Sequence, residues 1–193
     1  MTRSTGQETK DGGQSSRKLA QTFGKLIALL LVAILAILIE RYCTPEVPPF
    51  GPGAKVVSID GDTLRAGNGA EYRLFGIDAP ELHQTCNEAD GKSWLCGRAA
   101  KAKLTTILKR SNVNCEERTK DRFGRIVAVC SVEGVPDIGE AMVRDGYAVD
   151  LGETAGDLYA RAEAEAQAGK RGIWRGTFER PSDWRKANLQ GAE

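Results

Sequence analysis

The sequence predicts a small α+β domain, mainly β, in which a five-stranded barrel is capped by about three helices. Short β-branched runs alternate with Gly and Asp turns between residues 55 and 77, and similar runs recur between residues 112 and 132. Apolar residues recur at helical spacing between and after these runs. The chain has 193 residues, 41% of them hydrophobic, which is enough for one domain of ordinary size plus extensions.

The extensions begin at the N-terminus. Residues 1–25 are polar and rich in Gly, Ser and Thr, which predicts a disordered tail on the cytoplasmic side. Residues 26–39 form an uninterrupted apolar run, LIALLLVAILAILI, with basic residues before it. We interpret residues 26–43 as a single hydrophobic helix that anchors the chain in a membrane, with the domain outside the cytoplasm, on the periplasmic or cell-surface side.

Other interpretations of this hydrophobic segment stay open. A cleaved signal, which would release a secreted form, fits the basic flank, although the following residues contain no small-x-small cleavage site. A lipoprotein signal would use Cys43, but the preceding Tyr42 is too large for that processing. A buried core helix would be polar on at least one edge, and this segment is not.

The domain itself is predicted over residues 54–178, between a Pro-rich linker at 44–53 and a C-terminal tail at 179–193. Its expected strands are 55–59, 63–66, 70–77, 112–116 and 126–132, and its expected helices are 97–110, 138–144 and 157–168. One helix between the third and fourth strands and two after the fifth correspond to the plan of the OB-fold, whose strand faces often bind oligonucleotides.

Four cysteines besides Cys43 lie in this domain: Cys86, Cys96, Cys115 and Cys130. An even number in an exported domain predicts two disulfides, and four cysteines allow three pairings. The first two bracket one loop and the last two lie on strands that should form a hairpin, so we favour pairing within each couple. The alternative is four buried free thiols, which an oxidising compartment disfavours.

Composition excludes several kinds of function. The formal net charge of +1 argues against a protein that coats nucleic acid through bulk charge, so any contact with phosphate must be local. The single histidine, His83, excludes a zinc site built on several histidines. Acid-base chemistry is therefore left to carboxylates.

Three carboxylates are expected to converge at one end of the barrel. Asp62 follows the first turn, in IDGDT, while Asp78 and Glu81 follow the third strand, in FGIDAPE. Oxygen ligands of this kind, with a backbone carbonyl and waters, suit a hard cation such as Ca²⁺. Each acid alone is more often a turn former, but Arg73 and Arg125 nearby favour a site for a phosphate.

Three stretches, in this order and spacing, resemble the signature stretches of the staphylococcal nuclease-like (thermonuclease) family. They are IDGDT at 59–63, YRLFGIDAPE at 72–81 and DRFGR at 121–125. EAMVRDGYA at 140–148 and AQAGKRGIW at 166–174 are also similar in type and position, so the resemblance extends from about Val56 to Trp174.

The resemblance implies an OB-fold and a Ca²⁺-dependent endonuclease, a phosphodiesterase that acts on DNA or RNA. It implies that Asp62 and Asp78, with the carbonyl of Ala79, bind calcium. It further implies that Glu81 is the general base and that Arg73 and Arg125 hold the scissile phosphate. Arg122 and Phe123 stand where the family has a basic residue and an aromatic residue that contact the nucleotide.

Two rival interpretations assign the domain no strong catalysis. One is a catalytically weak OB-fold module that binds nucleic acid or protein, and it predicts loss of at least one catalytic or metal side chain, all of which are present. The other is a membrane-tethered adaptor whose acids and arginines form a surface network. In each interpretation we expect a monomer.

Overall fold

The computed structural model describes residues 24–38, 55–110 and 112–189. The chain divides into two compact units, Met1–Val47 and Pro48–Glu193. In the first unit, residues 24–38 form a helix with exposed side chains. The predicted linker and nearly all of the predicted N-terminal tail lie outside the described residues.

The helix at residues 24–38 overlaps the membrane anchor predicted over 26–43, and residues 39–43 of that prediction lie outside the described part of the chain. No helix in the described ranges is both long enough and apolar enough to span a membrane.

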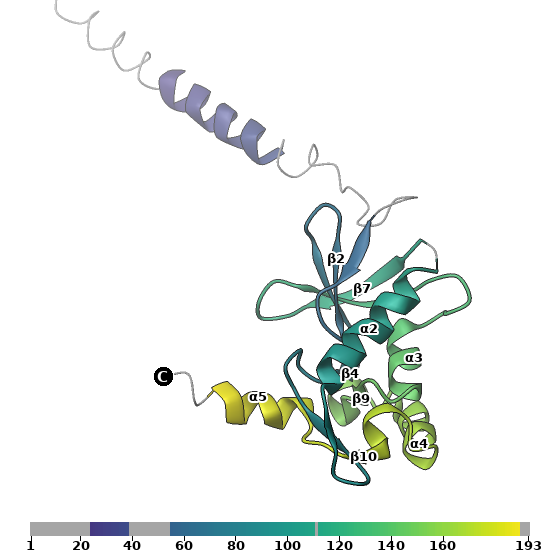
Figure 1. The fold of residues 1–193 in the computed structure, drawn as a ribbon. Coiled ribbons are helices and arrows are strands. Elements are labelled where there is room, and N and C mark those ends of the chain that lie inside the picture. The colour runs from purple at the N-terminus through teal and green to yellow at the C-terminus, as the bar shows by residue number, and fades with distance from the viewer. Residues whose placement is uncertain (1–23, 39–54, 111, 190–193) are drawn as a thin grey trace, which may run out of the picture. The chain divides into compact units, whose positions relative to one another are not determined.

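The second unit is built on a five-stranded mixed sheet, shown in Figure 1. Its order is β1 (Val56–Ser58), β2 (Thr63–Ala66), β3 (Glu71–Leu74), β8 (Ile126–Ser131) and β7 (Asn114–Lys120). Neighbouring strands are antiparallel except β3 and β8, which are parallel with Arg73 opposite Val127. The sheet therefore contains the five predicted strands, and the α+β class is as expected.

The predicted closed barrel is not found among the described strands, because no ladder there joins β7 to β1. The third predicted strand also ends early. Gly76 adopts a φ of 77°, which favours glycine, and a Cβ there would lie 2.9 Å from the ring of Tyr159. The chain bends at this residue, and β4 (Ile77–Asp78) pairs with β9 (Val149–Asp150) instead of continuing the main sheet.

Four helices belong to the second unit as described: α2 (Cys96–Leu108), α3 (Ile138–Arg144), α4 (Ala160–Ala168) and α5 (Pro181–Leu189). Two 3₁₀ turns, η1 (Gly152–Ala155) and η2 (Gly172–Arg175), flank α4. The first three helices lie where periodicity predicts them. No element was predicted after residue 178, and α5 was therefore missed.

The main hydrophobic core lies between the large sheet and helices α2 and α3. Leu64 and Leu74 from the sheet, Leu104 from α2, and Ile138 and Met142 from α3 are at most 1% exposed. Because these side chains come from β2, β3, α2 and α3, the same packing fixes the strand ends from which the candidate site projects.

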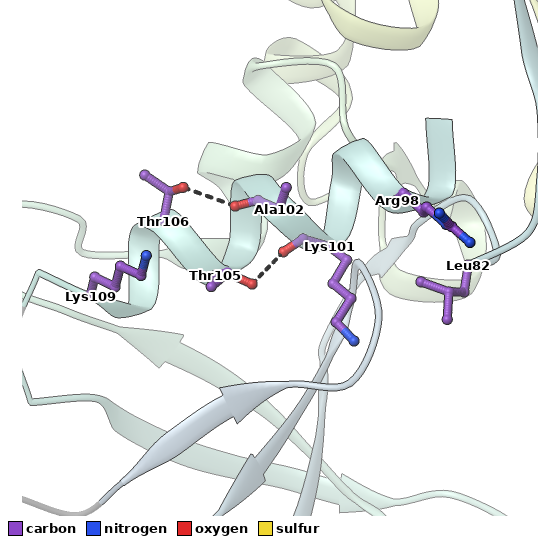
Figure 2. Close-up of a pocket in the computed structure, with 7 residues that line it drawn as sticks. All are labelled: Leu82, Arg98, Lys101, Ala102, Thr105, Thr106 and Lys109. Carbon is purple, nitrogen blue, oxygen red and sulfur yellow. Dashed lines mark hydrogen bonds between the residues drawn. The ribbon is translucent and has the colours of Figure 1, made fainter. Parts of the chain in front are cut away.

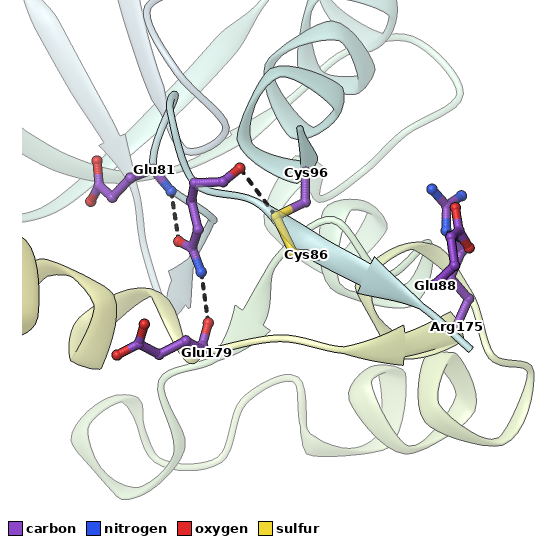
Figure 3. The surroundings of a disulfide bond; sticks show 7 residues. Glu81, Cys86, Glu88, Cys96, Arg175 and Glu179 are labelled. Carbon is purple, nitrogen blue, oxygen red and sulfur yellow. Dashed lines mark hydrogen bonds and ion pairs between the residues drawn. A yellow bond between two sulfur atoms is a disulfide. The ribbon is translucent and has the colours of Figure 1, made fainter. Parts of the chain in front are cut away.

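A small second sheet carries one of the two disulfides. It contains β5 (Cys86–Glu88), β6 (Ser93–Trp94) and β10 (Gly176–Thr177), and its hydrophobic cluster includes Cys86, Cys96 and Ile173. Figure 3 shows the Cys86–Cys96 bond, which ties β5 to the start of α2. The second disulfide joins Cys115 and Cys130, which are direct partners on β7 and β8. Both pairings agree with the prediction.

Removal of the Cys115–Cys130 disulfide should lower the free energy of unfolding by about 3 kcal/mol, because the bond closes a loop with a sequence separation of 15. The measurement is denaturant unfolding of Cys115→Ala/Cys130→Ala and of the wild type, each with and without a reducing agent. In reductant, the difference in unfolding free energy between the two proteins should shrink to the part that comes from replacing the two cysteine side chains by alanine. A difference that reductant leaves unchanged would contradict the assignment.

Candidate active site

The turn between β1 and β2 directs Asp62 into the protein. Asp60 Oδ1 accepts hydrogen bonds from the backbone N–H groups of Asp62, at 2.9 Å, and Thr63, at 2.7 Å. This arrangement is a side-chain-stabilised turn of the kind that aspartate favours. As a result the Asp62 side chain points toward β3 and is almost fully buried.

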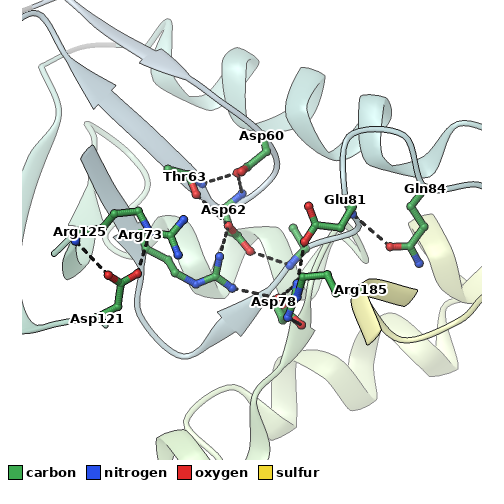
Figure 4. Close-up of polar contacts among 11 residues, drawn as sticks. Asp60, Asp62, Thr63, Arg73, Asp78, Glu81, Gln84, Asp121, Arg125 and Arg185 are labelled. Carbon is green, nitrogen blue, oxygen red and sulfur yellow. Dashed lines mark hydrogen bonds and ion pairs between the residues drawn. The ribbon is translucent and has the colours of Figure 1, made fainter. Parts of the chain in front are cut away.

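Arg73, in the middle of β3, bridges the two buried carboxylates, as Figure 4 shows. Its Nη1 lies 2.7 Å from Asp62 Oδ1, and its Nη2 lies 2.9 Å from Asp78 Oδ1. Asp62 is 3% exposed and Asp78 is 2% exposed. The structure therefore brings Asp62, Arg73 and Asp78 together as the sequence predicts.

The segment after β4 places Ala79 and Glu81 beside this bridge. The N–H of Ala79 donates to Asp62 Oδ2 at 3.0 Å, and the N–H of Glu81 donates to Oε1 of the buried Gln84 at 3.1 Å. Gly97 in α2 lies against the same segment, and a Cβ at that position would overlap the carbonyl oxygen of Glu81. The backbone of Glu81 is thus fixed from two sides, while its side chain stays one-third exposed.

Helix α5 adds Arg185, a residue that no sequence pattern indicated. Its Nη1 lies 2.9 Å from Asp78 Oδ1 and 2.8 Å from Glu81 Oε1, and its Nη2 lies 2.9 Å from Asp78 Oδ2. The two carboxylates precede Arg185 by 107 and 104 residues. No local motif connects positions so far apart, so only the tertiary fold reveals this contact.

Arg125 lies on the other side of the same cavity and does not contact the carboxylate cluster directly. Its Nε donates to Asp121 Oδ2 at 2.7 Å, which leaves four of its five N–H donors for other partners. Phe123 is 68% exposed, with the guanidinium of Arg122 at 4.8 Å from the ring centre. A cavity of about 630 Å³ is lined by Arg73, Glu81, Phe123, Arg125 and Arg185, among others.

The electrostatics of the cluster reflect its burial. Desolvation raises the pKa of Asp62 to about 7, although Arg73 and the N–H of Ala79 favour the charged form. Partial burial disfavours the charged form of Arg185, but hydrogen bonds to Asp78 and Glu81 outweigh it and raise the pKa of this guanidinium. Burial therefore disfavours the ionised form of Asp62 even with Arg73 beside it, and further positive charge near this carboxylate would stabilise that form.

The donor set suits a hard divalent cation. Asp62 and Asp78 offer carboxylate oxygens, the adjacent Ala79 offers a backbone carbonyl, and Ca²⁺ prefers oxygen ligands of these kinds. Among the described residues no three Asp, Glu, His or Cys side chains are grouped as a metal site. The three carboxylates expected to converge, Asp62, Asp78 and Glu81, are therefore not grouped as a metal site, whereas the set implied by the family resemblance contains only two carboxylates and the Ala79 carbonyl.

A second depression, of about 580 Å³, lies along α2 and is shown in Figure 2. Leu82, Arg98, Lys101 and Lys109 are among its lining residues, and no carboxylate lines it. It therefore offers no carboxylate that could accept a proton or bind a metal.

Comparisons with known proteins point to one family. Residues 71–176 match the model described as staphylococcal nuclease homologue. Succinoglycan biosynthesis protein ExoI of Rhizobium meliloti is 33% identical over 144 residues, which are 74% of this chain and 74% of that protein. An "uncharacterized endonuclease" of Haemophilus influenzae is 32% identical over 139 residues, which are 68% of this chain and 72% of that protein.

A plant protein extends the comparison. The probable staphylococcal-like nuclease CAN3 of Oryza sativa subsp. japonica is 31% identical over 136 residues, which are 69% of this chain and 33% of that protein. The segment matched by the family model contains Arg73, Asp78, Glu81 and Arg125, whereas α5 lies beyond its end.

The pKa of Asp62 predicts how stability depends on pH. The carboxyl group has a pKa of about 7 in the folded protein and 3.8 as its ordinary value, so the folded protein holds a proton that the unfolded chain releases between these values. The stabilising contribution is complete below about pH 4 and is lost as the pH rises toward 7. Asp62→Asn cannot titrate, so it should gain stability relative to the wild type between about pH 4.5 and about pH 7.5.

Denaturant unfolding of the two proteins at several pH values, with a chelator present, measures this difference. If the free energies of unfolding of the two proteins differ by the same amount at every pH tested, Asp62 has an ordinary pKa.

Proposed function

The chain belongs to the staphylococcal nuclease homologue family, and from this premise we propose that it is a Ca²⁺-dependent nuclease that hydrolyses phosphodiester bonds of DNA or RNA. The observation that carries the proposal is one cavity lined by a partly exposed carboxylate, Glu81, and by two arginines, Arg73 and Arg125, beside two buried aspartates. Relatives named as an endonuclease and as a staphylococcal-like nuclease support it.

In this proposal Glu81 is the general base. It accepts a proton from a water molecule, whose oxygen then forms a bond to phosphorus as the bond to the leaving oxygen breaks. The role requires access to water and a fixed backbone. The one-third exposed side chain of Glu81 and the contacts of its backbone with Gln84 and Gly97 are consistent with both.

The two arginines bind the phosphate in this proposal. Arg73 donates one N–H to each aspartate and has further donors left, while Arg125 is held through Nε alone. Two guanidiniums facing the phosphate stabilise the negative charge that grows in the transition state. Calcium, held by Asp62, Asp78 and the Ala79 carbonyl, would supply further positive charge to the same oxygens when bound.

Substrate contact beyond the phosphate is assigned to the turn between β7 and β8. Phe123 is the exposed aromatic residue of this turn, and such a ring offers a stacking surface to a base. Arg122 lies over the same ring and adds positive charge toward a neighbouring phosphate. We also propose, on the two disulfides, that the domain works in an oxidising compartment outside the cytoplasm, and we propose a monomer.

Digestion of plasmid DNA and of RNA by the full-length chain tests the function. Cleavage should require Ca²⁺ and stop with excess chelator. Glu81→Gln keeps its size but cannot accept a proton at neutral pH, so turnover should fall by a factor of ~10²–10⁴ while substrate binding persists.

The control is Glu71→Gln, which makes the same change at a surface ion pair with Arg65 and should leave turnover near the wild-type value. Raising the pH should recover part of the rate of Glu81→Gln, since hydroxide replaces the activated water. Binding of nucleic acid without any hydrolysis would favour the rival interpretation, a non-catalytic binding module. Equal activity of all three proteins would remove Glu81 from the mechanism.

A further inference from the structure

We propose that Arg185 and a divalent cation compete for Asp78, so that helix α5 is docked on the active site when the cation is absent and leaves it when the cation binds. The inference rests on the proposed function in one respect, the role of Asp78 as a metal ligand. It goes beyond that function by making the C-terminal helix a part of the cation response.

Hydrogen bonds already occupy most acceptor sites of the Asp78 carboxylate. Arg185 donates to both of them, and Oδ1 accepts a second hydrogen bond from Arg73, as Figure 4 shows. A carboxylate has about four lone-pair sites, so three are already used. Calcium needs oxygen ligands at about 2.3–2.6 Å. An ion at that distance from Asp78 would meet the guanidinium of Arg185 at the same oxygens.

The balance of charge in the cluster also favours the exchange. The three carboxylates Asp62, Asp78 and Glu81 face two guanidiniums, from Arg73 and Arg185. With all three carboxylates ionised, exchange of Arg185 for a divalent cation brings the charge of this group to balance. Retention of both would leave an excess of positive charge in a largely buried space, where like charges repel strongly. The exchange is therefore favoured over the simultaneous presence of both.

The attachment of α5 to the rest of the domain depends strongly on Arg185. None of its described residues belongs to either hydrophobic cluster. The hydrogen bonds and ion pairs that join side chains of the described part of α5 to the sheets and to helices α2 to α4 all come from Arg185. Figure 1 shows the helix projecting from the body of the domain. Pro181 is buried and Trp184 is half-buried, so departure of the helix would expose part of these two side chains but no residue of either hydrophobic cluster.

The segment just before α5 is attached independently, which confines the motion to the helix. Gln84 Nε2 donates to the carbonyl oxygen of Glu179 at 2.7 Å, and Arg180 donates to the carbonyl oxygen of Asp150 at 3.2 Å. The same Gln84 accepts from the N–H of Glu81. Departure of α5 would therefore open the cavity while the backbone of Glu81 stays in place.

Calorimetric titration of Ca²⁺ into the full-length chain measures the competition directly. If α5 is docked in about nine of ten cation-free molecules, the apparent affinity for Ca²⁺ is reduced about tenfold. The variant Arg185→Gln should therefore bind Ca²⁺ about tenfold more tightly than the wild type. The matched control is Lys186→Gln on the same helix, because it removes the same charge from a side chain that is 73% exposed and pairs only locally with Asp183. The Ca²⁺ affinity of this control should stay within about twofold of the wild-type value.

Hydrogen exchange of residues 181–189 in the wild type provides a readout that needs no variant. Addition of Ca²⁺ should speed exchange in α5, and Arg185→Gln should exchange rapidly even without Ca²⁺.

Three outcomes would overturn the proposal. Equal or weaker Ca²⁺ binding by Arg185→Gln would show that Arg185 does not compete with the cation, and slower exchange in α5 on addition of Ca²⁺ would show that helix and cation bind together. If none of the three proteins binds Ca²⁺, the metal has no part in the proposed function, and Arg185 has no cation to compete with. The first two outcomes leave the proposed nuclease function intact, so the two failures can be distinguished.

Discussion

The guanidinium of Arg73, which donates to Asp62 at 2.7 Å and to Asp78 at 2.9 Å, is the contact on which the rest of the site depends. Each aspartate is nearly inaccessible to water, and a buried carboxylate without a partner is strongly destabilising. Arg73 can meet both because it lies opposite Thr63, the residue after Asp62, and because the chain bends at Gly76 before Asp78 on β4. One side chain thus holds the two buried carboxylates of the cavity together.

Rigid contacts extend this arrangement to Glu81. Its backbone is held by Gln84, and the close approach of Gly97 leaves no room for a side chain at the start of α2. The Cys86–Cys96 disulfide closes the loop that joins β5 to the start of α2. The domain therefore fixes the position of Glu81 through its backbone, and the side chain faces the cavity, where its carboxylate pairs with Arg185.

Much of this could be predicted from the sequence, because the signals are local. The five main strands, three helices and both disulfides follow from β-branched runs, helical spacing and cysteine positions. The juxtaposition of Asp62, Arg73 and Asp78 follows from a meander whose turn and strand end must meet. The bend at Gly76 was missed because a lone glycine within a strand-like run does not reveal its φ angle. Arg185 was missed because its partners are more than one hundred residues away.

A stability cycle in the presence of chelator shows whether the buried aspartates require the positive charge of Arg73. Near pH 8, Arg73→Gln should lower the free energy of unfolding by about 3–5 kcal/mol, because it leaves two buried carboxylates with less compensation. Arg73→Gln/Asp62→Asn should recover a large part of that loss, since one of the two charges is gone. A loss below about 1 kcal/mol for the single variant, or a double variant no more stable than the single one, would contradict the account.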